Sequence, residues 1–441
     1  PTGGFVVAFN DNSFAHPAGV PAGEVSNGSF AQVFDEGGSP VGDAFLINDI
    51  TAGTQNQPDL AAKSDGTIVA VYTDNSSADG SGTGVFLRQF DASGTALNAS
   101  VQVNVEFSST QSDATVDVLD GGRIVVTWTS FASGTAGDGN NNGVFARLFE
   151  ADGVTPVGGE FQVNTSTSSN QDAARVAALT DGSFVVVWDD DSGVDGSSTA
   201  VQMQRFDANG APIGGEILVN ETISSAQFDP YVVALDTGGW VVAWSDNSCA
   251  DGSGTGVFGQ IYAADGSRVD GQIQLNSEFL STQSEARLVA LPGGGFTAVW
   301  TSFASGTAGD GSGNGVFQQV FADPANVQIS DNPVMVALDP SITLDEADVN
   351  AGGQLFASAV GLGDTDSPDF DGGRLTVSMV VNDVIQTQFA SPDDGSQDQL
   401  GFDTSGIVSI SGTTLSVGGV AIGTIVSDGT DGSELIVDLN S

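Results

Sequence analysis

Short apolar runs that end in an aromatic residue recur along most of the chain. Unbroken apolar runs of this kind are typical of β-strands that are covered on both faces. A second segment of the form Val-Phe-x-x-x-aromatic follows most runs, and then a turn with Asp and Gly, a short strand and a strand that begins with Gln. No helical periodicity interrupts this series, so we expect four short strands per repeat. The runs are Phe5–Phe9, Ile68–Tyr72, Ile124–Trp128, Phe184–Trp188, Trp240–Trp244 and Phe296–Trp300.

The repeats are themselves duplicated. The stretch Trp128–Gly139 returns unchanged 172 residues later as Trp300–Gly311, and within each half an asparagine recurs every 56 to 60 residues. Periods of this length indicate units that bury one another's faces by stacking. Six copies of a four-stranded unit predict an all-β fold, a six-bladed β-propeller over residues 1–331 that is built as a duplicated three-blade unit. A linear β-solenoid is the alternative.

The period ends near residue 332. Alternating segments such as Leu375–Val381 and Thr414–Val417 then predict a small β-sandwich of the immunoglobulin or cadherin-like type over residues 332–441. The first repeat lacks its own Gln-x-x-Pro strand, so either an upstream segment or residues 332–338 would complete that blade. We also expect the sequence to be a piece of a longer polypeptide.

The charge is strongly one-sided, with 56 acidic against nine basic residues and a net charge of −47. Such a field repels nucleic acids and anionic membranes. No apolar run reaches membrane-spanning length. Two explanations of the acidity stay open, a general adaptation to salty media and dedicated calcium sites.

One histidine and one cysteine exclude a disulfide framework, a histidine-based zinc site and a Ser-His-Asp or Cys-His catalytic arrangement. The prediction is therefore that the chain is not an enzyme. Paired carboxylates for glycoside hydrolysis stay possible, because aspartate is abundant, but the sequence singles out no pair.

Aspartates spaced by five residues follow several of the aromatic strands, and a glycine directly follows each second aspartate. Calcium requires six to eight oxygen ligands, which loops rich in Asp, Asn and Ser can supply. The alternative is that these side chains form Asx-turns. A tail cluster is a further calcium candidate, because four close carboxylates repel one another unless a cation joins them. The candidates are Asp74/Asp79, Asp190/Asp195 and Asp246/Asp251, and in the tail Asp364, Asp366, Asp369 and Asp371.

Two aromatic residues, Phe131 and Phe303, lie in Gly/Ser/Thr-rich loops and are candidate ligand-binding residues. The alternative is that each ring pins its loop onto the blade. Gln and Asn residues that recur in every repeat are interpreted as partners of backbone groups, since structural roles repeat with the fold whereas active sites break its symmetry.

Several of these features resemble the tandem blades of large secreted bacterial proteins of the calcium-dependent RTX type, over roughly residues 3–330. They are Gln227/Pro230, Trp244, Asp251-Gly252 and Val219-Asn220. The tail resembles the cadherin-like modules that accompany such repeats. This resemblance implies export to the bacterial cell surface, calcium binding and an adhesive or matrix role, although the glycine-rich nonapeptide calcium repeats do not occur in this sequence.

The sequence thus predicts a non-catalytic, calcium-binding adhesion or structural module of a large secreted bacterial protein. Its partners would be an extracellular polysaccharide, a protein surface or further copies of itself. The first alternative is a lectin-like propeller that binds a polysaccharide, and the next is a glycan-cleaving enzyme. Carboxylates that converge asymmetrically on the propeller axis would favour the enzyme.

Overall fold

The computed structural model divides the chain into two units, Pro1–Asn326 and Val327–Ser441. The structure describes residues 4–11, 28–80, 82–105, 110–131, 141–252, 254–276, 282–303 and 315–321 of the first unit, and the strands of the second. Over these ranges it contains no helix that is long and apolar enough to span a membrane.

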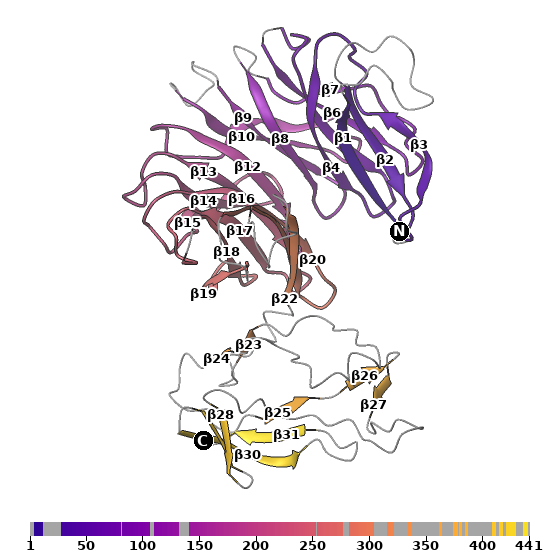
Figure 1. The fold of residues 1–441 in the computed structure, drawn as a ribbon. Coiled ribbons are helices and arrows are strands. Elements are labelled where there is room, and N and C mark those ends of the chain that lie inside the picture. Colours follow the sequence, from indigo (N-terminus) through magenta and orange to yellow (C-terminus); the bar gives the residue numbers. More distant parts are fainter. Residues whose placement is uncertain are drawn as a thin grey trace. The chain divides into compact units, whose positions relative to one another are not determined.

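The first unit is the predicted six-bladed propeller. Its sheets are antiparallel and follow one another along the chain (Figure 1). The middle four blades have four strands each, and the first and last have three strands among the described residues. The strands, blade by blade, are β1 (Phe5–Asp11), β2 (Gly28–Phe34) and β3 (Pro40–Leu46); β4 (Gln55–Ala62), β5 (Ile68–Asp74), β6 (Gly84–Phe90) and β7 (Val101–Gln102); β8 (Gln111–Val118), β9 (Ile124–Ser130), β10 (Gly143–Phe149) and β11 (Pro156–Gln162); β12 (Gln171–Ala178), β13 (Phe184–Asp190), β14 (Ala200–Phe206) and β15 (Pro212–Leu218); β16 (Gln227–Ala234), β17 (Trp240–Asp246), β18 (Gly256–Tyr262) and β19 (Arg268–Gln274); β20 (Gln283–Ala290), β21 (Phe296–Ser302) and β22 (Gly315–Phe321).

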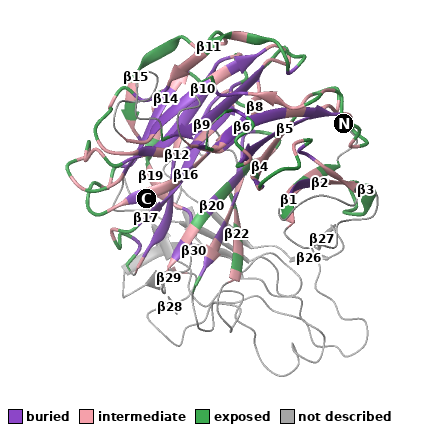
Figure 2. Ribbon diagram, turned by 90° about the horizontal axis from the view of Figure 1, so that it is seen from above, coloured by how far each residue is buried: buried purple, intermediate pink, exposed green. Residues whose placement is uncertain are grey.

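The apolar runs form β1 in the first blade and the second strand of every other blade. Every residue of β5, β9 and β17 is buried, because neighbouring blades cover both faces of these sheets (Figure 2). Aromatic residues pair across to the third strand, as in Trp128–Phe145, with ring centroids 6.3 Å apart. In the last blade, half-buried and exposed residues alternate along β22, and Val316 is 77% exposed. The reason is that, among the described residues, this sheet has a neighbouring blade on one side only.

Hydrogen bonds of the repeated Asn and Gln join consecutive blades and confirm their structural interpretation. In the pair Asn220–Gln227, the asparagine Oδ1 accepts the N–H of Val201 at 2.9 Å and its Nδ2 donates to the glutamine Oε1 at 3.1 Å. The asparagine follows the outer strand of one blade and the glutamine begins the innermost strand of the next. Equivalent amide pairs are Asn48–Gln55, Asn104–Gln111, Asn164–Gln171 and Asn276–Gln283.

The second unit contains a five-stranded sheet in the order β25-β31-β30-β29-β28 and two strand pairs, β23-β24 and β26-β27. Its immunoglobulin or cadherin-like identity stays a prediction. The proposed closing segment, 332–338, is described only at β23, and the rest of it lies outside the described residues. The strands are β23 (Val334–Val336), β24 (Gly361–Gly363), β25 (Arg374–Val377), β26 (Met379–Val381), β27 (Val384–Gln386), β28 (Val408–Ser411), β29 (Thr414–Val417), β30 (Val420–Asp428) and β31 (Leu435–Leu439).

Candidate functional site

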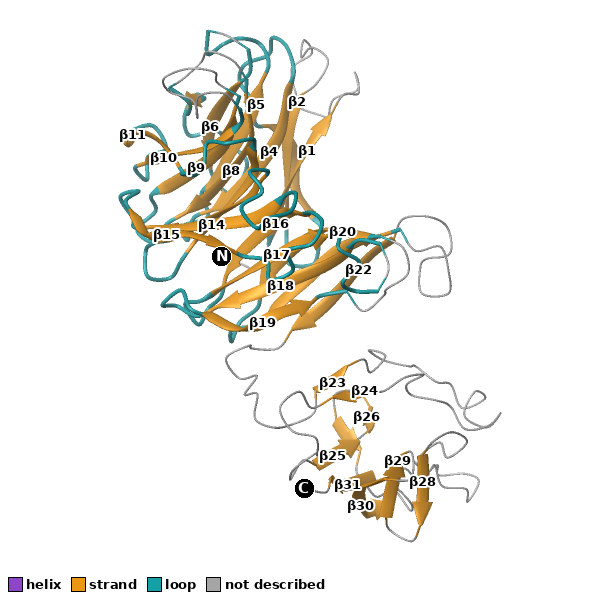
Figure 3. Cartoon of the chain, turned by 90° about the vertical axis from the view of Figure 1, so that its left-hand side faces the viewer, coloured by secondary structure: helices purple, strands orange, loops and turns teal. Residues whose placement is uncertain are grey.

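The first strands of five successive blades, β4, β8, β12, β16 and β20, lie side by side and form the inner wall of the propeller. Each begins at the face where the second strand of its blade ends (Figure 3). Each also has a bulge at the same place, where its third residue adopts a positive φ of 50 to 59°. Bulges re-aim the side chains around them and are common beside functional sites. The bulged residues are Gln57, Asp113, Ala173, Asp229 and Glu285.

The fifth residue of each innermost strand lies two positions after the bulged residue. Its charge changes from each blade to the next, whereas the first residue of every one of these strands is glutamine. The five residues are Asp59, Thr115, Arg175, Tyr231 and Arg287. The hydroxyl of Thr115 forms a hydrogen bond with the hydroxyl of Thr127. The other four, together with Asp117 two residues further along β8, make up what we call the axial cluster.

Contacts and charges join the axial cluster across the inner wall. The guanidinium of Arg287 lies 5.3 Å from the ring centroid of Tyr231. Burial raises the pKa of the Tyr231 hydroxyl, and the charges of the other four members, Asp59, Asp117, Arg175 and Arg287, all act on it. Side chains from β4, β8, β12, β16 and β20 therefore converge on one place.

The two carboxyl groups of the axial cluster have different surroundings. Burial, with a smaller contribution from the charge of Asp59, raises the pKa of Asp117 to about 6, although the N–H groups of Ala178 and Val118 oppose the shift. Burial also raises the pKa of Asp59, but the N–H of Val116 and the positive charges of Arg175 and Arg287 lower it. Surroundings that shift the pKa values of two carboxyl groups by different amounts are typical of acid–base catalytic sites.

A further carboxyl group, that of Asp189, lies beside the bulge of β16 at a position where four of the other blades have a hydroxyl residue. Asp189 stands near the end of β13, where the other second strands have Thr73, Thr129, Ser245 and Thr301. Its Oδ2 accepts the N–H of Asp229 at 3.3 Å, as Ser245 Oγ accepts that of Glu285 in the next blade. Burial, with the nearby charges of Asp172 and Asp229, raises the pKa of Asp189 well above its usual value. This group adds another carboxyl to the face on which the innermost strands begin.

The predicted calcium loops make hydrogen bonds to the protein. The first aspartates, Asp74, Asp190 and Asp246, are buried and each accepts from the glutamine that begins its own blade, at 3.1, 3.4 and 3.2 Å. Each also accepts the backbone N–H two residues later, which is the geometry of an Asx-turn. The second aspartates, Asp79, Asp195 and Asp251, accept from the periodic asparagines at 3.2, 3.4 and 3.2 Å.

In the described part of the chain, no group of three or more Asp, Glu, His or Cys side chains is placed to hold a metal ion. Asp364, Asp366, Asp369 and Asp371 lie outside the described residues. Calcium binding thus stays a prediction for both the loops and the tail.

Thermal unfolding in excess chelator and after addition of calcium tests that prediction. Binding to the folded state raises the free energy of unfolding by about 2.7 kcal/mol when calcium is present at a hundred times its Kd. A rise with calcium that magnesium does not reproduce supports the sites. An equal rise with sodium chloride of matched ionic strength contradicts them, because charge screening alone then accounts for it.

Phe131 and Phe303 follow β9 and β21 directly, on the face where the innermost strands begin. Their backbone N–H groups donate to Thr110 and Thr282 at 2.9 Å, so the chain is anchored at each point. The side chains are 43% and 39% exposed, which leaves part of each ring available to a ligand. Ligand contact by these two residues stays a prediction.

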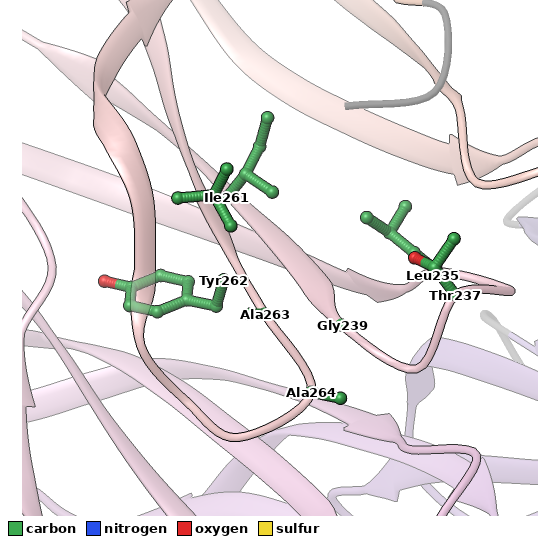
Figure 4. Close-up of a pocket in the computed structure, with 8 residues that line it drawn as sticks. Leu235, Thr237, Gly239, Ile261, Tyr262, Ala263 and Ala264 are labelled. Atoms are coloured by element: carbon green, nitrogen blue, oxygen red, sulfur yellow. The ribbon is translucent and has the colours of Figure 1, made fainter. Parts of the chain in front are cut away.

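A cavity of about 140 Å³ lies away from the axial cluster, in the fifth blade (Figure 4). Leu235, Ile261, Tyr262 and Val269 line it with four small or hydroxylated residues. Burial raises the pKa of Tyr262 to about 12, so its hydroxyl stays protonated at neutral pH. The lining includes no carboxylate and no cationic group, and we assign it no chemistry.

No family model matches the chain, and no curated protein matches it. The resemblance to RTX-type repeats and cadherin-like modules is therefore without support from these comparisons. Among solved structures, a protein of unknown function from Dyadobacter fermentans is 11% identical, with 73% of this chain and 92% of that one aligned and a TM-score of 0.49. An intramolecular trans-sialidase from Ruminococcus gnavus is 10% identical over the same shares, with a TM-score of 0.47. An endo-arabinase from Bacteroides thetaiotaomicron is 12% identical, with 63% and 95% aligned and a TM-score of 0.36. At such identities these likenesses concern the propeller fold alone.

The prediction of a non-catalytic adhesion or structural module, and of no enzyme, is wrong and is corrected here. The inner wall holds two carboxyl groups in unlike surroundings, Asp59 and Asp117, which the repeat pattern concealed. Sequence reasoning excluded enzymes because histidine and cysteine are scarce, yet carboxyl chemistry requires neither. Aligning the repeats on their glutamines would have exposed the axial cluster, since the fifth residue of the strand changes charge at each blade.

Proposed function

We propose that the propeller is a glycan-cleaving enzyme whose reaction takes place at the axial cluster. The observation that carries this proposal is the pair Asp59 and Asp117, two half-buried carboxyl groups on adjacent innermost strands with raised pKa values and different charged neighbours. Glycoside hydrolysis uses two carboxyl groups, one as an acid and the other as a base or nucleophile. We retain the extracellular location and polysaccharide partner as parts of this proposal.

In the proposed reaction, Asp117 protonates the oxygen of the scissile glycosidic bond. Its pKa of about 6 keeps a substantial fraction protonated in mildly acidic solution, which a general acid requires. Asp59 is the partner carboxylate, because Arg175 and Arg287 favour its ionised form. It either activates a water molecule or attacks the sugar directly, and the bond to the leaving sugar breaks as Asp117 delivers its proton.

The test is a panel of neutral and acidic polysaccharides, incubated with the purified full chain and assayed for new reducing ends. We expect cleavage of at least one polymer, with an optimum below pH 7 and loss of activity in the double variant D59N/D117N. NMR of the first product then shows whether the anomeric configuration is retained or inverted, which identifies the role of Asp59. Binding without cleavage by both the native chain and the variant would contradict the enzyme and favour the lectin-like alternative, for which the exposed rings of Phe131 and Phe303 are the supporting observation.

A further inference from the structure

The seven arginines of the propeller fall into two groups. Five of them reach across a blade boundary and donate to a backbone carbonyl of the neighbouring blade, so they are fixed in structural bonds. These bonds are Arg88 to Ile47, Arg123 to Ala208, Arg147 to Val103, Arg205 to Ala264 and Arg268 to Leu218, at 2.6 to 3.3 Å. The other two, Arg175 and Arg287, stand on the innermost strands and belong to the axial cluster.

Arg175 and Arg287 make the same local contact. Each donates from Nη1 to the carbonyl of the residue before it, Ala174 at 2.9 Å and Ala286 at 2.7 Å. That bond orients the guanidinium plane and uses one of its five N–H groups. The positive charges of both arginines also act on the carboxyl group of Asp59.

Contacts orient the guanidinium of Arg287 but do not use all of its N–H groups. Asp229 Oδ2 lies 3.6 Å from its Nη1, which is an ion pair but longer than a good hydrogen bond, and the side chain is 44% exposed. Contact with the ring of Tyr231 restricts the guanidinium further. A pre-oriented planar fork with N–H groups to spare is suited to bidentate binding of a carboxylate.

We infer that Arg175 and Arg287 bind the carboxylate of an acidic sugar, so that the substrate is a uronic acid-containing polysaccharide. This inference rests on the proposed function, because it assigns the substrate class of the same site. A neutral sugar would offer no charged partner to the remaining N–H groups of these two guanidinium groups. The chain as a whole repels an acidic polymer through its net charge of −47, so selection of such a polymer has to come from these two fixed groups at short range.

The experiment compares matched ligands that differ in the carboxylate alone. Oligomers of galacturonate, glucuronate, mannuronate and guluronate are titrated into the full chain by calorimetry, and each is repeated after chemical reduction of its carboxyl groups to alcohols. We expect at least one acidic oligomer to bind roughly tenfold or more tightly than its reduced form. R175Q and R287Q should each weaken binding of the acidic form by roughly ten- to a hundredfold, the effect of losing a hydrogen bond to a charged group, and leave the reduced form unchanged.

R123Q is the matched control, because Arg123 is a half-buried arginine in the turn between β8 and β9 that pairs with Glu150 and is no member of the axial cluster. It should leave every affinity unchanged, and R287K, which keeps the charge without the fork, should be intermediate. Acid-selective binding without cleavage would sustain the inference while the proposed hydrolysis fails. Two outcomes would overturn the inference. One is no binding of any acidic oligomer. The other is cleavage of neutral polymers together with equal affinity for reduced and acidic oligomers, which would leave the proposed hydrolase intact.

Discussion

Replacement of Asp117 by asparagine is expected to lower kcat for glycan cleavage by about two to four orders of magnitude, the usual contribution of a general acid. The N–H of Val118, which Asp117 Oδ1 accepts at 2.7 Å, loses its acceptor. Asparagine has nearly the same shape, however, and keeps one oxygen, which can still accept the N–H of Ala178 that Asp117 Oδ2 accepts at 2.8 Å. The fold should therefore persist while the transferable proton is lost. The measurement is steady-state kinetics on the polymer that the native chain cleaves.

The pH dependence of kcat/KM in D117N tests directly whether Asp117 is the general acid. Because a general acid acts in its protonated form, kcat/KM of the native chain should fall as the pH rises through about 6, the pKa to which burial raises Asp117. In D117N this alkaline limb should disappear. Substrates whose leaving group needs no proton, such as a nitrophenyl glycoside, should lose much less activity than the natural polymer.

D120N is the matched control for this variant. Asp120 lies three residues away in an exposed turn, where its Oδ1 accepts the N–H of Gly121. It should leave kcat and the pH profile unchanged. Full activity in D117N, or an alkaline limb that persists there, would show that Asp117 is not the acid and that the role belongs to another carboxyl, with Asp189 the next candidate.

Replacement of Asn220 by alanine is expected to lower the free energy of unfolding by about 3 kcal/mol. The side chain is buried, and its loss leaves the N–H of Val201 and the Oε1 of Gln227 without that partner in a place that water does not reach. A buried polar group that loses its partner costs about 1–3 kcal/mol. Urea unfolding followed by tryptophan fluorescence measures the change.

N276A should behave in the same way, because Asn276 makes the equivalent bonds to Val257 and Gln283. N209A is the control, since Asn209 is exposed in a turn, and its effect should stay within about 0.5 kcal/mol. A loss below about 1 kcal/mol in both N220A and N276A would mean that the bonds between blades contribute little and that apolar packing between the sheets holds the propeller alone.

Much of the fold could be predicted because its determinants are local and repeated. The run Trp240–Trp244 indicates a strand covered on both faces, and the structure buries all of β17 as the second strand of its blade. The periodic asparagines and glutamines were interpreted correctly, since a side chain that recurs at every repeat most simply serves the backbone. Repetition also misled, because the regular aspartates drew attention to the loops and away from residues that occur once.

The sequence by itself determined that this chain is a series of stacked four-stranded sheets, because hydrophobic burial and strand length are properties of short stretches. It also indicated that the periodic amides serve the backbone, while the structure showed that they join the blades. Only the tertiary structure decided that five residues share one place, since they come from strands roughly 60 residues apart that meet only when the blades pack side by side. These residues are Asp59, Asp117, Arg175, Tyr231 and Arg287. Burial in that shared place, and the charges that meet there, set the pKa values on which the chemistry depends.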